Sequence, residues 1–518
     1  MMERLTSAPD DLESARRRIA ELTGAHGEWF YTQVGESVSI ALSVSEFDFR
    51  VSPGRLIFSC WSERGTIHWR VIGWAWTSDN KLRLEVRRRM GAERALLELV
   101  PRASASAISE MVIAARRKNC ERMALLACAQ ARGAKVLRTA LSPGVRRGQP
   151  GRYARILLKL PFERIAVTGT VAEASAHETD AFLSAALVWF LRLADGACQP
   201  YIQKLWLVVQ KERVEATVQR LALLNEHLRR ATALYEIDDR LQEIAPVRSP
   251  ERAEMWTQHR TRFRSPPVET EISEPCARIV ALAPQAIDVV RARHGETLRF
   301  HGLPFARVRR VMGRACVWFG IDGPRRRLLD ESAEQEWMKL LRELEDHRRA
   351  EADDRQHALY RSLPEAWLES LLRRDITRLD PGLIIAPLHA QFRASQEARG
   401  AGARPVDLLA LRRDGRLVVI ELKVAEDREH VLQGADYWRQ VEAHRRQGHI
   451  TRARLFKDAA ILDEPPLVYL VAPTLRFHRS FHTLAQAIDP AIEIYRFDIN
   501  EDWRTGVRTM RRVRVNGR

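Results

Sequence analysis

The chain has 518 residues, among them 84 Lys or Arg and 67 Asp or Glu, which give a net charge of +17 and an isoelectric point near 10.1. This length predicts three or four domains, and the basic balance favours a polyanionic partner such as nucleic acid. Six cysteines without a Cys-x2-Cys pair argue against a zinc centre, and the lack of a signal peptide or of an apolar run of about 18 residues predicts a cytoplasmic protein without a membrane partner.

Residues 1–100 are expected to form a Trp-rich β domain that follows a charged helix. Alternation and turn residues predict strands at 37–44, 55–61, 66–76 and 81–87. Four tryptophans crowd this sheet, namely Trp61, Trp69, Trp74 and Trp76. Two interpretations are open: the tryptophans form a hydrophobic core, or they form an exposed platform that stacks on bases while arginines hold phosphates.

Residues 101–245 are expected to form an α/β module. The pattern predicts helices at about 104–132, 179–194 and up to 230, with strands at 155–160, 164–169, 204–209 and 233–238. A basic loop before the first of these strands carries Arg146, Arg147 and Arg152, which are candidate nucleic-acid contacts.

Two further segments precede the C-terminal domain. A linker around Pro266 and Pro267 leads into a small α+β unit, so that this unit is placed within 246–330. Residues 331–361 are dense in Glu and Arg at i, i+4 spacing, which predicts a charged helical spacer.

The most informative stretch lies in the predicted domain at 362–518. An apolar strand ends in Glu421-Leu422-Lys423, and Asp407 precedes a neighbouring apolar run. Two carboxylates can hold a Mg²⁺ ion that polarises a phosphate and acidifies a bound water. Only 9 of the 84 basic residues are Lys. Because this chain uses Arg almost wherever a plain positive charge suffices, a lysine at this position indicates a specific role.

The turn between the two runs decides whether the carboxylates can meet. Residues 412–416 read Arg-Arg-Asp-Gly-Arg, a hairpin signal. A two-residue turn would place Asp407 and Glu421 on opposite faces of the sheet. A three-residue loop with a left-handed Gly415 would place them opposite each other on one face. The sequence allows both loops, and only the second makes a site.

Two flanking helices supply further candidates. The helix near 362–379 carries Glu365, which fits a capping box with Ser362, and Glu369, which has no such duty and is the candidate third acidic group. After the strand, Gln433 and Tyr437 stand four residues apart on a predicted helix and so share one face.

Taken in order, these residues resemble the PD-(D/E)XK nuclease superfamily, most closely its NucS/RecB-like branch, over about residues 362–475. The resemblance implies a restriction-endonuclease-like α/β core, Mg²⁺ or Mn²⁺ as cofactor, and a catalytic set of Glu369, Asp407, Glu421 and Lys423, with Gln433 and Tyr437 in support. Residues 101–245 have the same order of elements, with Val167-Thr168-Gly169 where Glu-x-Lys would fall. They are either a degenerate copy of that fold or an unrelated module.

We therefore expect a multi-domain α/β protein that acts as a metal-dependent DNA endonuclease. Its substrate would be duplex, branched or single-stranded DNA, in repair or defence and alongside other proteins of those processes. A DNA-binding scaffold with an inactive nuclease fold is the first alternative, and an RNA-directed nuclease is the second. The chain contains neither a P-loop nor a G-x-G-x-x-G motif, which argues against ATP-driven activity.

Overall fold

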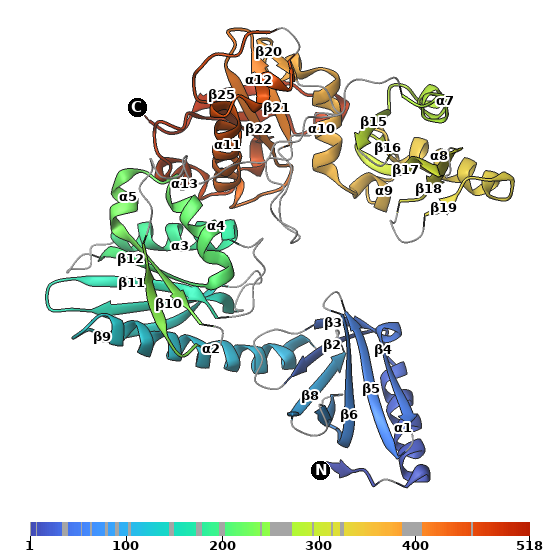
Figure 1. Cartoon of the computed structure of the whole chain (residues 1–518), viewed down its shortest axis with the longest axis vertical. Helices are drawn as coiled ribbons and strands as arrows, with labels where there is room; N and C mark the ends of the chain where they lie inside the picture. Colours follow the sequence, from blue (N-terminus) through green and yellow to red (C-terminus); the bar gives the residue numbers. More distant parts are fainter. Residues whose placement is uncertain are drawn as a thin grey trace. The chain divides into compact units, whose positions relative to one another are not determined.

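The computed structural model describes most of the chain (Figure 1). The longer stretches outside the described residues are 34–39, 144–149, 172–178, 196–201, 249–271 and 386–406, and the other gaps are of four residues or fewer. The described residues form a mixed α/β protein with four sheets. They divide into two compact units: the first is Met1–Ser175, Gly196–Lys211 and Ala233–Val247, and the second is the remainder. None of the described helices is long and apolar enough to cross a bilayer.

The first sheet of unit 1 is antiparallel, and helix α1 (Pro9–Gly24) packs against its strands β4 and β5. Its strands are β1 (Glu3–Arg4), β2 (Glu28–Gln33), β3 (Ile40–Ser43), β4 (Phe47–Ser52), β5 (Arg55–Ser62), β6 (Gly65–Trp76), β7 (Leu82–Arg88) and β8 (Glu93–Pro101). Trp69 and Trp74 are buried, and Trp76 packs against the same core. Burial leaves the rings of Trp69 and Trp74 no free face for a base, which favours the core interpretation for these two, whereas Trp61 and Trp76 are half-buried.

The second sheet of unit 1 follows helix α2 (Ala105–Gln130). Its order is β14-β13-β12-β11-β10-β9, formed by β9 (Lys135–Pro143), β10 (Pro150–Lys159), β11 (Arg164–Thr170), β12 (Ile202–Gln210), β13 (Thr232–Ile237) and β14 (Ile244–Val247). The predicted strands all occur, the helix predicted up to about residue 230 is divided into α4 (Lys211–Leu221) and α5 (Glu226–Ala231), and β9 and β14 were not predicted. Residues 167–169, which stand where Glu-x-Lys would fall, lie within β11 and include no carboxylate. The Thr168 hydroxyl instead donates to the Ala154 carbonyl.

The part of unit 2 that follows residue 248 begins with an antiparallel sheet in the order β15-β16-β17-β18-β19. The strands are β15 (Ile287–Ala292), β16 (Gly295–Phe300), β17 (Leu303–Val311), β18 (Arg314–Phe319) and β19 (Arg327–Leu328). Helices α7 (Glu274–Leu282) and α8 (Glu334–His347) cover one face, and α8 buries Trp337, Leu341 and Leu344 there. Helix α8 therefore belongs to this module and is not a spacer, because its apolar stripe completes the core of the sheet.

Arg348 joins this module to the domain that follows. Its guanidinium is fully buried and donates to the carbonyls of Phe300 (2.9 Å), His301 (2.8 Å), Leu359 (2.6 Å) and Ser362 (2.8 Å). It also lies 4.8 Å from the centre of the Trp367 ring. One side chain thus satisfies buried carbonyls from strand β16, from its end and from both ends of helix α9 (Ala358–Arg361).

The C-terminal sheet has the order β20-β21-β22-β23-β24-β25. Its strands are β20 (Leu383–Ile385), β21 (Leu408–Arg412), β22 (Leu417–Leu422), β23 (Leu467–Pro473), β24 (Ile494–Ile499) and β25 (Thr509–Arg514). Helix α10 (Pro364–Arg374) packs on one face through Leu368 and Leu372, and helix α11 (His430–Arg446) packs on the other through Tyr437 and Val441. Strand β22 is buried on both faces, as its continuous apolar run predicts.

This sheet and the β9–β14 sheet share one strand order. In each, the first three strands pair antiparallel, the third and fourth pair parallel, and the last two pair antiparallel. Each sheet is preceded by a helix, and in each a helix (α3, Thr179–Ala194, or α11) connects the third strand to the fourth. The order of elements thus agrees with a second copy of the fold that lacks the acidic residues.

Helices α3, α4 (Lys211–Leu221) and α5 (Glu226–Ala231) contact the C-terminal domain within unit 2. Arg220 forms ion pairs with Asp180 on α3 (2.9 Å) and with Asp436 on α11 (2.9 Å). Beyond α4, the Asn225 amide donates to the Ala487 carbonyl and the Asp489 amide donates to the Leu223 carbonyl, both at 2.9 Å. A reciprocal two-bond bridge therefore joins the end of α4 to the end of α13 (Phe481–Ala487).

Candidate active site

The β21–β22 hairpin brings the two predicted carboxylates together. Leu408 pairs with Ile420 and Leu411 pairs with Leu417, so Asp407, the residue before β21, lies opposite Glu421. The Arg412 amide donates to the Arg416 carbonyl at 2.8 Å, and Gly415 has φ of 91°. The three-residue loop is thus the one present, and Gly415 supplies the left-handed residue that this loop requires.

Asp407, Glu421 and Lys423 form a compact cluster in which Glu421 and Lys423 are buried and Asp407 is half-buried. Lys423 Nζ lies 2.8 Å from Glu421 Oε1 and 3.6 Å from Asp427 Oδ2. Asp407 Oδ2 accepts a hydrogen bond of 2.9 Å from the Leu422 amide. Glu421 is 2% exposed and Lys423 is 6% exposed, so both charges have been withdrawn from water and depend on each other.

Burial perturbs the protonation of all three groups. It raises the pKa of Asp407 well above its ordinary value, and the negative charge of Glu421 raises it further. Burial also raises the pKa of Glu421. Burial by itself lowers the pKa of Lys423, but the carboxylates of Glu421, Glu365 and Asp427 together outweigh this effect and the net shift is upward. Lys423 is therefore an ammonium group at neutral pH, which suits it to hold a water or balance charge but not to remove a proton.

Two buried oxygen atoms near this cluster lack a partner. Among the described residues, no donor lies in hydrogen-bonding geometry with Glu421 Oε2 or Gln433 Oε1, although the Gln433 amide nitrogen donates to Glu429 at 3.2 Å. The glycine after Gln433 brings α11 close to the sheet, because a Cβ at Gly434 would lie 2.5 Å from Leu470. An unpaired carboxylate oxygen and an unpaired amide oxygen are the donors that a hard cation takes.

The contacts of the two α10 glutamates, Glu365 and Glu369, differ from those predicted. Helix α10 has Leu363 as its N-cap, with no side-chain capping bond, so the capping-box interpretation of Glu365 is wrong. The charge of Glu365 instead raises the pKa of both Glu421 and Lys423. Glu369 pairs with Arg373 at 2.7 Å and with Arg299 at 3.9 Å, while its charge contributes to the raised pKa of Asp407. Glu365 is the acidic residue that sequence reasoning set aside.

The two α11 residues predicted to support the site lie in different surroundings. Tyr437 is buried in the apolar layer between α11 and the hairpin, beside Leu409 and Val419. Gln433 lies one turn earlier, nearer the strand end. His430 was not predicted: its Nε2 lies 3.2 Å from the Glu421 carbonyl oxygen, and burial followed by the charge of Lys423 lowers its pKa to about 3. It is a neutral ring that supports the strand end.

The oxygen donors fit a hard divalent cation in part. In the portion of the chain that the structure describes, no group of three or more His, Cys, Asp or Glu is arranged to hold a metal ion. Mg²⁺ is commonly bound by one or two protein carboxylates, with waters and substrate phosphates completing its shell. The Asp407–Glu421 pair with the free Glu421 Oε2 meets that smaller requirement.

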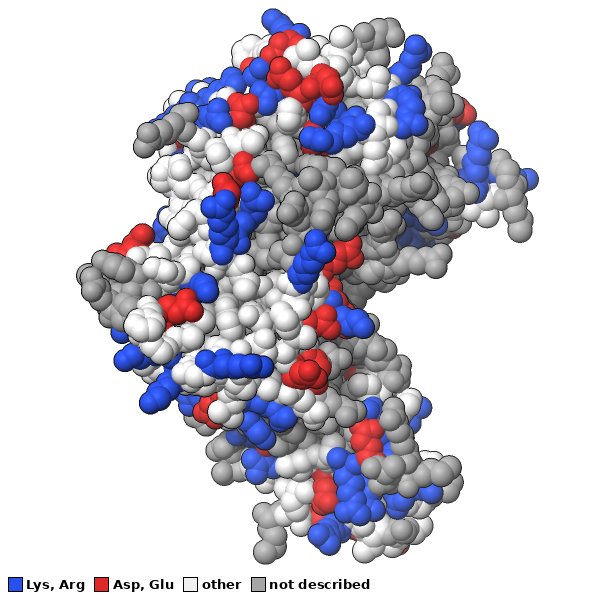
Figure 2. Space-filling view, turned by 60° about the vertical axis from the view of Figure 1, so that its left-hand side comes forward, with Lys and Arg blue, Asp and Glu red and all other residues white. Residues whose placement is uncertain are grey.

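The remaining nucleic-acid predictions find little support in geometry. Arg152 is exposed on β10, whereas Arg146 and Arg147 lie outside the described residues, as do Pro405 and Val406 before Asp407. On the face drawn in Figure 2, basic side chains are spread over the surface with acidic ones between them. The net charge therefore does not single out a binding site on that face.

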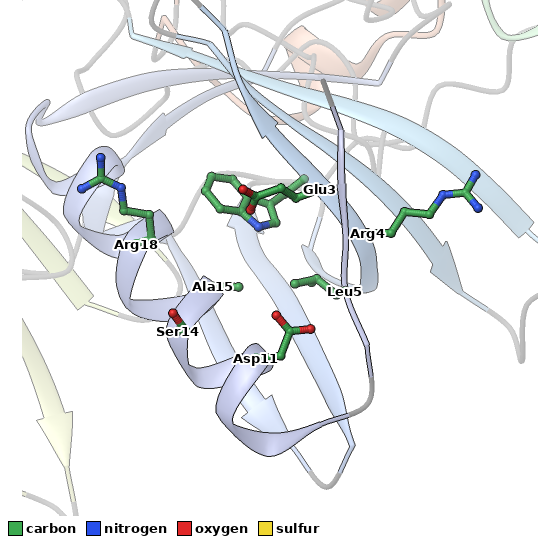
Figure 3. A pocket seen from close by; sticks show the side chains of 8 residues that line it. Glu3, Arg4, Leu5, Asp11, Ser14, Ala15 and Arg18 are labelled. Carbon is green, nitrogen blue, oxygen red and sulfur yellow. The ribbon is translucent and has the colours of Figure 1, made fainter.

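A hollow of about 400 Å³ lies in unit 1, between α1 and the N-terminal strand. Figure 3 shows Asp11, Ser14 and Arg18 extending from the helix, with Glu3 and Arg4 on the strand opposite. The lining mixes both charges, and Thr6 donates through its amide and its hydroxyl to Asp11. This internal pairing leaves no convergent set of groups, and we assign the hollow no chemistry.

Comparison with protein-family models, with curated proteins and with solved structures found no match to this chain. The geometry of residues 362–518 therefore carries the functional argument.

Removing the Asp407 charge should stabilise the protein when no divalent ion is present. The pKa of Asp407 is higher in the folded than in the unfolded state, so its contribution favours folding at acidic pH and is lost as pH rises through the folded pKa. At pH 8 in EDTA, Asp407→Asn should gain about 0.5–2 kcal/mol, measured by thermal unfolding. The gain should shrink at pH 4, and an equal or lower melting temperature at pH 8 would contradict the electrostatic assignment.

Proposed function

We propose that residues 362–518 form a metal-dependent nuclease domain with a restriction-endonuclease-like core, which hydrolyses phosphodiester bonds in DNA. The observation that carries the proposal is the pairing of half-buried Asp407 with buried Glu421, where Lys423 lies 2.8 Å from Glu421 and Glu421 Oε2 has no hydrogen-bond partner among the described residues. The resemblance of the motif order to the PD-(D/E)XK superfamily supports the same conclusion.

The residues have separate roles in this proposal. Asp407 and Glu421 would hold Mg²⁺ or Mn²⁺, with the Gln433 amide oxygen and Glu365 beside them. Such an ion polarises a phosphate and lowers the pKa of a water that it binds. Lys423, kept protonated by Glu421, orients the attacking water towards the phosphorus or balances the charge that develops on the phosphate. Burial of the cluster strengthens each of these interactions.

One observation favours the rival function of a DNA-binding scaffold without activity. Glu369, which the resemblance places in the catalytic set, is committed to ion pairs with Arg373 and Arg299. If a third carboxylate is essential, the site needs Glu365 or a rearranged Glu369. Cleavage by the wild-type chain is therefore the deciding measurement.

The test is a cleavage assay with end-labelled duplex, single-stranded, flapped and mismatched DNA, and with single-stranded RNA. The full chain is incubated with Mg²⁺, with Mn²⁺ or with EDTA, and Glu421→Gln serves as the isosteric control. We expect ion-dependent cleavage of at least one DNA by the wild type and none by the variant. Absence of cleavage from every DNA, or equal cleavage by Glu421→Gln, would overturn the proposal, and cleavage of RNA alone would reassign the substrate.

A further inference from the structure

Helices α7 and α8 cover one face of the β15–β19 sheet, and α10 contacts the opposite face at Asp288 and Arg299. Strand pairing places Arg307 opposite Thr297 on one side and opposite Trp318 on the other, and places Arg309 opposite Cys316. The apolar partners of the core, such as Leu298, Ala306 and Phe319, point to the covered face because side chains alternate along a strand. The face opposite α7 and α8 therefore carries arginine side chains beside a partly buried tryptophan.

We call Arg299, Arg307, Arg309, Arg326 and Trp318 the arginine face. Arg307, Arg309 and Arg326 form no ion pair or side-chain hydrogen bond with any described residue. The Nε atoms of Arg299, Arg307 and Arg326 are buried without a hydrogen-bond partner. Burial, followed by the charges of Arg309 and Arg326, lowers the pKa of Arg307. Arg307, Arg309 and Arg326 are thus neighbouring like charges without a counter-ion among the described residues, which costs stability that an external anion would restore.

The arginine face adjoins the candidate active site. Arg299 lies 3.9 Å from Glu369 on α10, and Arg373 on the same helix bonds both Glu369 (2.7 Å) and the Asp407 carbonyl (2.9 Å). Asp288, which pairs with Arg299 across strands β15 and β16, accepts hydrogen bonds from Ser370 and Arg374. The sheet is thus fastened to the helix that flanks the Asp407–Glu421 pair.

We propose that the arginine face binds the phosphate backbone of the nucleic acid whose scissile phosphate lies at Asp407 and Glu421, and this inference rests on the proposed function. Alternate residues along a strand are about 6.8 Å apart, so Arg307 and Arg309 present two guanidinium groups along one line, which suits a repeating polyanion. Trp318 beside Arg307 offers a ring on which an unpaired base stacks. An acidic protein would gain the charge contacts but would not use that ring.

The test measures DNA binding without cleavage. The full chain carrying Glu421→Gln is titrated, in EDTA, into fluorescently labelled duplex and single-stranded DNA at several salt concentrations. Adding Arg307→Ala and Arg309→Ala together should weaken binding roughly tenfold or more and reduce the slope of log K against log salt by about 2, since each phosphate contact contributes about 0.9. Arg310→Ala is the matched control, because Arg310 is exposed on the same strand and faces the opposite side.

The outcomes separate this inference from the proposed function. Unchanged affinity and slope in the double variant, an equal loss in Arg310→Ala, or no binding of DNA at all would overturn the inference, whether or not the wild type cleaves. The inference would also be overturned if poly-L-glutamate bound as tightly as DNA and the double variant lost both affinities equally. That result would indicate an acidic protein as the partner. If the double variant loses DNA binding and the wild type cleaves no DNA, the arginine face is supported and the proposed nuclease function is rejected.

Discussion

Cleavage by Lys423→Met should fall by roughly 10²–10³-fold, as expected for the loss of one preorganised charged donor in a buried site. DNA affinity should stay within a few-fold, because Lys423 is 6% exposed and pairs with Glu421 and Asp427. Lys423→Arg should fold but remain strongly impaired, since it restores the charge next to Glu421 without the compact ammonium geometry. Single-turnover cleavage and equilibrium binding separate these effects.

The control for this series is Lys339→Met, because Lys339 is an exposed lysine on α8. Its cleavage rate should equal that of the wild type. Wild-type cleavage by Lys423→Arg would mean that the position needs only a positive charge. Wild-type cleavage by Lys423→Met would remove the residue from the mechanism.

Arg348→Met should destabilise the region around α8, α9 and α10 by about 3–5 kcal/mol. The substitution leaves the carbonyls of Phe300, His301, Leu359 and Ser362 buried without their donor, and each unsatisfied group costs about 1–3 kcal/mol, with partial relief from water. Hydrogen exchange across residues 295–372 should therefore accelerate while the β9–β14 sheet keeps its protection. Local exchange is the better measure here, because a chain of several modules need not unfold in two states.

Arg349→Met is the control, because Arg349 is the exposed neighbour of Arg348 and its ion pair with Asp353 is weak at 3.9 Å. It should change exchange little, as expected for a surface pair. Similar acceleration of hydrogen exchange in both variants would show that the loss of a positive charge after α8, and not the loss of the buried donor, controls the stability of this region.

Local patterns were enough to predict most elements and the central part of the site. The apolar run of β22 and the helical pattern of α3 reflect burial within one strand or helix, and both elements occur where the pattern placed them. Asp407 and Glu421 meet because the hairpin that joins them is short, so the register depends on few residues.

The sequence of the hairpin alone could not decide between the two loops, because residues distant in the sequence stabilise the one that forms. The Gly415 carbonyl accepts from the Leu462 amide at 2.7 Å, and a Cβ at Gly415 would lie 2.7 Å from the Ala460 carbonyl oxygen. The loop conformation is thus stabilised by a segment far along the chain. The same holds for Glu365: whether it or Glu369 faces the cluster depends on the rotation of α10, which Arg373 and Arg299 set.

Distance in sequence also explains the error at residues 331–361. A run of Glu and Arg reads as a solvated arm, yet Trp337, Leu341 and Leu344 form a stripe that finds its partner on strands β16 and β17. Arg348 looked like one more surface charge, because none of the carbonyls that it bonds is visible in its neighbourhood of the sequence.

The ion pairs of Arg220 limit how far the C-terminal domain can be treated as a module. Asp436 is buried on α11, and although burial alone would raise its pKa, the charge of Arg220 and then Arg439 lowers it. A fragment that begins at residue 362 would lose Arg220 and the bridge at Leu224 and Ile488, leaving a carboxylate short of its partner beneath newly exposed apolar surface. We therefore expect residues 362–518 alone to be less stable than the same residues in the full chain. Any recombination that transplanted the site would have to bring α3 and α4 with it.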